Sequence, residues 1–74
     1  MNEINYVIER EIETISTRGS WNLELNLISW NGAPAKYDLR TWNDSHTRMG
    51  KGVTFTKDEA VALMKTLETE FERS

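Results

Sequence analysis

The chain has 74 residues, no cysteine and a formal net charge of -3 at pH 7. A chain of this length forms one domain and buries only about 60% of the surface that it exposes when unfolded. We therefore expect a single domain over residues 1–74 that associates with a second copy. The absence of cysteine excludes a disulfide framework and a thiolate metal site.

The sequence carries no signal for a membrane or for export. No apolar run approaches the roughly 20 residues of a membrane span. The N-terminal segment Met1-Asn2-Glu3 lacks the basic region that opens a signal peptide. We expect a cytoplasmic protein with no membrane association.

Positive charge is confined to the middle of the chain. Residues 1–15 carry four acids and one base, residues 16–57 three acids and six bases, and residues 58–74 five acids and two bases. Salt screens charges more than about 8–10 Å away, so the local field matters more for binding than the net charge. The middle segment can therefore attract a polyanion on an acidic protein.

Two alternating runs predict a hairpin of strands. Residues 6–16 alternate between an apolar and an acidic face, and residues 21–30 form a second alternating run after a polar break. In the first run the apolar face holds Tyr6, Ile8 and Ile12, and the acidic face holds Glu9, Glu11 and Glu13. In the second run Trp21 shares the leucine-rich face, where we expect it in the core. Trp30 lies on the opposite face, among polar side chains.

Residues 36–43 predict a third strand with an unusual face. Asn31-Gly32-Ala33-Pro34-Ala35 is a turn by composition. Alternation then places on one face Lys36, Asp38, Arg40 and Trp42. Basic groups meet phosphates and an indole stacks on unpaired bases, so this face suits single-stranded nucleic acid. We expect single-stranded DNA or RNA as the partner, and no small-molecule substrate.

The C-terminal part predicts a short strand at residues 53–55 and one amphipathic helix ending at Arg73. Thr56 and Glu59 fit a capping box, and apolar residues then recur at intervals of three and four. A helix on one face of a curved sheet leaves apolar surface for a second copy. The expected dimer interface is Val61, Met64, Leu67 and Phe71. The expected fold is α+β: a curved four-stranded antiparallel sheet and a C-terminal helix, assembled as a homodimer.

Several of these motifs resemble a known family. They are Asp38-Leu39-Arg40 with Trp42 after it, the run from Gly50 to Thr56, and the acidic start of the helix. The pattern is similar to the transcriptional coactivator family founded on positive cofactor four, and most similar to its short YdbC-like bacterial and phage branch. The resemblance implies a β-β-β-β-α protomer, a homodimer, and a groove that binds single-stranded DNA. By motif position it places the groove residues at Trp30, Lys36, Arg40, Trp42 and Lys51.

Two departures separate this chain from the eukaryotic members. The eukaryotic proteins have a basic, phosphorylatable N-terminal tail and a lysine-rich first hairpin. This sequence shows no such tail, and its first strand carries Glu9, Glu11 and Glu13. The resemblance therefore implies DNA binding without implying a coactivator role.

Each candidate binding residue also has a structural interpretation. Trp30 and Trp42 could cap the edge of a small core, because an indole prefers burial. Lys36 and Arg40 could form ordinary ion pairs with Asp38. Lys51 lies in a glycine-flanked turn that is either of the anion-binding kind or a simple turn before the last strand. Arg18 and Arg48 are loop cations at possible groove rims or plain solubilising charges.

The sequence predicts no catalytic residue, no cofactor and no metal. The three glutamates of the first run predict a solvated face or a guarded edge strand, since one strand cannot surround a cation with six or more oxygens. His46 is the only histidine, and no partner for it is identifiable in its polar loop. The alternative function is a small regulatory protein-interaction module that uses the acidic helix and the first strand.

Overall fold

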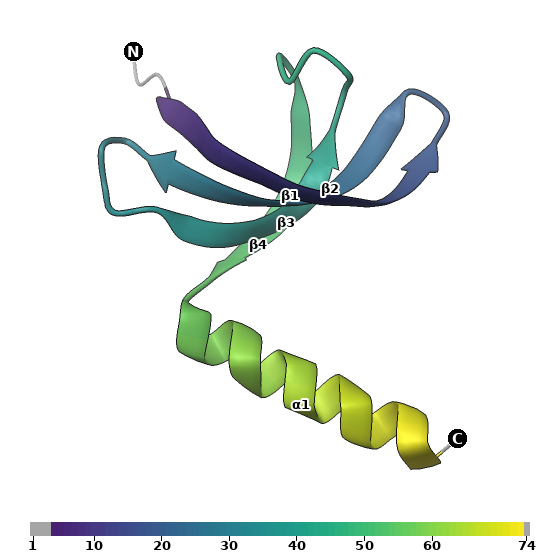
Figure 1. Ribbon diagram of the computed structural model, residues 1–74. Helices are drawn as coiled ribbons and strands as arrows, with labels where there is room; N and C mark the ends of the chain where they lie inside the picture. Colours follow the sequence, from purple (N-terminus) through teal and green to yellow (C-terminus); the bar gives the residue numbers. More distant parts are fainter. Residues whose placement is uncertain (1–3, 74) are drawn as a thin grey trace.

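The structure, a computed structural model, describes residues 4–73 and consists of one sheet followed by one helix (Figure 1). The elements in chain order are β1 (Tyr6–Arg18), β2 (Trp21–Trp30), β3 (Lys36–Trp42), β4 (Met49–Phe55) and α1 (Lys57–Arg73). Each strand pairs antiparallel with the next, in the spatial order β1-β2-β3-β4. The predicted α+β meander with a C-terminal helix is therefore confirmed. Among residues 4–73, no helix is long and apolar enough to cross a membrane.

Strand β4 begins at Met49, earlier than predicted, so the segment expected as a turn belongs to the strand. Two glycines allow this pairing with β3. A Cβ atom at Gly50 would clash with the side chain of Thr41, and one at Gly52 would clash with Arg40. At Gly52 the clash involves Cβ and backbone atoms, so glycine is required there for β4 to approach β3 this closely, whereas at Gly50 only the end of the Thr41 side chain would have to turn away.

Strand β1 does not alternate as predicted, because its pairing with β2 contains three register shifts. Each bulge adds an unpaired residue and reverses the alternation after it. As a result Glu11 lies opposite Asn26, whereas Glu13 lies opposite Leu25 on the other face of the sheet. Ile12 lies near Leu25 and the helix. The prediction of one apolar and one acidic face on this strand is therefore wrong.

The two faces of the sheet differ in burial. We call the face with the even-numbered side chains of β2 and β3 the Trp42 face, and the opposite one the helix face. The buried side chains all lie on the Trp42 face: Glu24, Asn26, Ile28, Asp38 and Trp42. The β3–β4 connection lies against this face, where the Tyr6 hydroxyl donates to the His46 carbonyl at 2.6 Å. The Trp42 ring lies 5.3 Å from Tyr6 and 5.4 Å from His46, between ring centroids.

The helix face is incompletely covered. Helix α1 extends away from the sheet, and none of its residues is buried (Figure 1). Its N-terminus has the predicted capping box, in which the Thr56 N–H donates to Glu59 Oε1 at 2.8 Å and the Glu59 N–H donates to Thr56 Oγ1 at 3.2 Å. The exposed apolar side chains of the helix are Val61, Leu63, Met64, Leu67 and Phe71.

Trp21 is not a core residue, contrary to the prediction, because 39% of it is exposed. It begins β2 at the hairpin end, opposite Arg18. An apolar hollow of about 390 Å³ lies between the sheet and α1, and Trp21 is not among the residues that line it. The helix therefore leaves this end of the helix face uncovered.

Candidate nucleic-acid interface

The third strand presents the predicted row of side chains on the Trp42 face, but at different depths. Its register places Lys36 opposite Ile28 and Arg40 opposite Glu24. Lys36 is exposed and Arg40 is partly exposed. Trp42 is 0% exposed. A base cannot reach the Trp42 ring in this conformation, so the expectation that this indole stacks on a base is corrected to its alternative, a ring in the core.

Arg40 contacts two other side chains of the Trp42 face, Asp38 and Trp30. Its Nε and Nη2 donate to Asp38 Oδ1 and Oδ2 at 2.7 and 2.8 Å, so the pair is bidentate. Its guanidinium carbon lies 4.6 Å from the centre of the Trp30 ring, which is a cation–π distance. Nη1 has only the weak acceptor Sδ of Met49, at 3.6 Å. This nitrogen can therefore donate to an incoming anion without breaking the pair with Asp38.

Trp30 is the partly exposed indole of the Trp42 face. Its ring lies 5.7 Å from Tyr6, with the planes inclined at 48°, and carries the Arg40 guanidinium on its π system. Its buried Nε1–H has no acceptor among the described residues. The indole is thus held by an aromatic and a cationic neighbour while part of it stays open to solvent. This arrangement suits stacking on a nucleobase.

The other three predicted cations do not join this row. Arg18 ends β1 opposite Trp21, on the helix face. Arg48 is exposed in the loop before β4. Lys51 is exposed within β4, at a register shift, so alternation does not assign its side chain to the Trp42 face. The structure therefore brings together Trp30, Lys36 and Arg40 on the Trp42 face, places Arg18 on the helix face, and leaves Arg48 and Lys51 as exposed cations that its register does not assign to the row.

A polar group on the same face was missed from the sequence. His46 Nε2 lies 2.8 Å from Oε1 of the buried Glu24, and Asn26 Nδ2 donates to the same oxygen at 3.1 Å. The partner of His46, which was not identifiable from the sequence, is therefore Glu24 on β2. The His46 backbone has φ of 58°, which turns the loop back over the sheet. The one available signal was that Glu24 and Asn26 share their face of β2 with the large apolar residues Ile28 and Trp30, which indicates that this face is partly buried.

This antiparallel sheet with a cationic and aromatic row defines a small binding domain. A family model described as Transcriptional Coactivator p15 (PC4) matches residues 18–66. The chain is also 48% identical over 69 residues to a protein of Treponema pallidum (strain Nichols) described as uncharacterized, a match that covers 92% of this chain and 81% of that protein. The chain belongs to the transcriptional coactivator p15 (PC4) family, which confirms the resemblance to the coactivator family. Membership supports a DNA-binding, coactivator-like role.

Proposed function

We propose that this chain is a homodimeric protein that binds single-stranded DNA with weak sequence preference, through one nucleic-acid-binding domain over residues 1–74. The observation that carries the proposal is the stacking of Arg40 on Trp30 beside the exposed Lys36. It combines a base platform with phosphate donors on one surface of a chain from a DNA-binding family.

In this proposal the two kinds of contact have separate roles. Lys36 and Nη1 of Arg40 bind backbone phosphates, and Trp30 stacks on a base. Stacking requires an unpaired base but not a particular one, since every base has a π face. A duplex would offer this acidic protein only its phosphates, so single strands are preferred.

The proposed dimer rests on the apolar surface that one chain leaves open. The hollow between the sheet and α1 is lined only by apolar side chains, including Leu25, Leu39 and Leu63. Met64 and Leu67 of this lining are exposed, and the helix adds the exposed Val61 and Phe71. Burying such area contributes about 25 cal/mol per Å². We therefore propose that α1 of a second copy covers this surface, with the interface at Val61, Met64, Leu67 and Phe71.

The test is a titration against single-stranded and duplex DNA of matched length, followed by tryptophan fluorescence. Single strands should bind at least tenfold more tightly, a difference of about 1.4 kcal/mol. Quenching should come from Trp30, because Trp42 is buried and Trp21 lies on the helix face. Equal affinity for the two forms would contradict stacking, and equal affinity for single-stranded RNA would extend the partner class.

A salt series separates this function from the protein-interaction alternative. Phosphate binding weakens steeply as salt is added, because counterions are released on binding. If no single-stranded nucleic acid binds at low salt, the proposed function is wrong, and the exposed helix becomes the surface to test against protein partners.

A further inference from the structure

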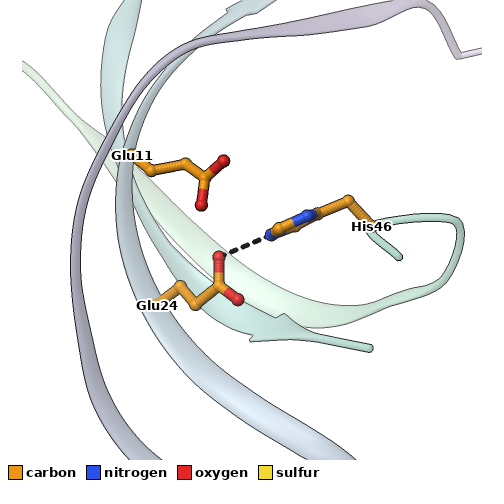
Figure 2. Close-up of side chains that lie close together, drawn as sticks. All are labelled: Glu11, Glu24 and His46. Carbon is orange, nitrogen blue, oxygen red and sulfur yellow. Dashed lines mark hydrogen bonds and ion pairs between the residues drawn. The ribbon is translucent and has the colours of Figure 1, made fainter. Parts of the chain in front are cut away.

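Three side chains that bind metals in proteins converge beside the Trp42 face. Glu11 comes from β1, Glu24 from β2 and His46 from the β3–β4 connection (Figure 2). One potential ligand atom of each residue lies within 4.8 Å of those of the other two. Figure 2 shows the two carboxylates on one side and the imidazole ring directed toward them from the loop. Three elements that are distant in sequence therefore supply one compact N/O donor set.

The convergence depends on features that fix each side chain. Because of the β1 bulges, Glu11 lies on the same face of the sheet as Glu24, whereas Glu13 lies on the opposite face. The loop is fixed by the hydrogen bond from Tyr6 to the His46 carbonyl. The Trp42 ring packs against the imidazole, with 5.4 Å between centroids. The fold thus holds Glu24 and His46 in place and brings Glu11 to the same face of the sheet.

Protein groups supply at most one positive charge in this cluster, on His46 when its ring is protonated, against two carboxylates. Glu24 is only 5% exposed, and both of its hydrogen bonds reach Oε1, from Asn26 and His46. Within residues 4–73 no hydrogen bond reaches Glu24 Oε2 or the Glu11 carboxylate. Arg40, across from Glu24 in β3, already pairs with Asp38. Burying a carboxylate is expensive unless a positive charge compensates it, so this arrangement favours a cation.

We propose that Glu11, Glu24 and His46 form a binding site for a divalent transition metal of the zinc class. Zinc binds imidazole nitrogen and carboxylate oxygen at about 2.0–2.2 Å, and in a tetrahedron two such ligand atoms lie about 3.3 Å apart. His46 Nε2 and Glu24 Oε1, now 2.8 Å apart, are already close to that spacing. A carboxylate oxygen of the exposed Glu11 lies within 4.8 Å of both atoms and moves closer to become the third ligand, while water takes the fourth position.

The donor set also selects between metals. Magnesium and calcium require six or more oxygen ligands and do not favour imidazole, whereas zinc, nickel and copper bind it well. A metal here would replace the imidazole–carboxylate hydrogen bond and link β1, β2 and the loop. The site is independent of the proposed nucleic-acid contacts, since it uses none of Trp30, Lys36 and Arg40.

The experiment titrates Zn²⁺ into the chelator-treated full chain, without nucleic acid, by isothermal calorimetry. The expected result is one ion per chain, with much weaker binding of Mg²⁺ and Ca²⁺. Glu11→Gln and His46→Gln should each lower the affinity for Zn²⁺ at least about tenfold. Mutating a residue that only hydrogen-bonds a metal ligand already lowers metal affinity by about that much. Glu13→Gln is the matched control, because it removes the same charge from the same strand on the other face.

A second measurement reports the ligands directly. Co²⁺ in place of Zn²⁺ should give the strong visible absorption of a four-coordinate site, and His46→Gln should abolish it. Circular dichroism shows that each variant is folded, and the exposed Glu11 is the variant least able to disturb the fold. The proposal is overturned if Zn²⁺ does not bind, if Glu13→Gln weakens binding as much as Glu11→Gln, or if Mg²⁺ binds equally well.

Discussion

The Trp42 face and the helix face of the sheet are completed in different ways. On the Trp42 face the chain buries Asp38 and Trp42 completely with its own strands and loop. On the helix face α1 buries none of its residues. Buried polar groups need hydrogen-bond partners at fixed distances, and on the Trp42 face the partners come from the same chain. Apolar burial is non-directional, so another surface can complete it.

The largest effect should come from breaking the polar pair on the Trp42 face. Arg40→Ala leaves the fully buried Asp38 without its cation, and breaking a buried pair costs about 3–5 kcal/mol. Urea unfolding followed by circular dichroism measures this loss. Lys36→Ala, a change at an exposed cation of the same strand, should remain within about 0.5 kcal/mol. Equal unfolding midpoints for the two variants would mean that the pair does not stabilise this face.

A substitution on the helix face should change dimerisation instead of the stability of the fold. Leu67→Glu places a charge in the apolar stripe of α1 and should weaken dimerisation by at least about 3 kcal/mol, because the charge would be buried without a partner. Sedimentation should then show the 8.6 kDa monomer where the native chain gives twice that mass. Lys65→Glu introduces the same group outside the stripe and should still dimerise. A monomeric native chain would contradict the proposed dimer.

The indoles of the two faces test where a base binds. Trp30→Ala should lower the affinity for single-stranded DNA by about 1–3 kcal/mol with little change in salt dependence. Trp21→Ala removes the same ring from the helix face and should leave affinity unchanged while the dimer persists. Anisotropy of a labelled oligonucleotide measures both. Similar losses for the two variants would indicate that the Trp42 face does not provide the stacking platform.

The smallest effect concerns phosphate contact by Lys36. Lys36→Ala should reduce the slope of log affinity against log salt by roughly 0.7, the value for one contact with a single strand. Arg40 is unsuitable for this measurement, because its removal also leaves Asp38 unpaired. Lys65→Ala on the helix controls for the change in net charge. An unchanged slope would remove Lys36 from the interface.

Sequence periodicity was sufficient for part of the interface. The alternation from Lys36 to Trp42 correctly placed these side chains on one face, because a regular strand has a strict period of two. The capping box at Thr56 was also predicted correctly, since it depends on residues only three apart. Both features are local, and local geometry is what a sequence pattern reports.

The tertiary structure decided the rest. The bulges of β1 moved Glu11 and Glu13 to opposite faces, because the pairing with β2 sets the register and no periodicity in β1 shows it. The burial of Trp42 and the partner of His46 depend on a loop that folds back over the sheet. The sequence by itself thus determined which residues share a regular face. Only long-range pairing decided how deep each one lies and what it contacts, because those properties depend on segments far apart in the chain.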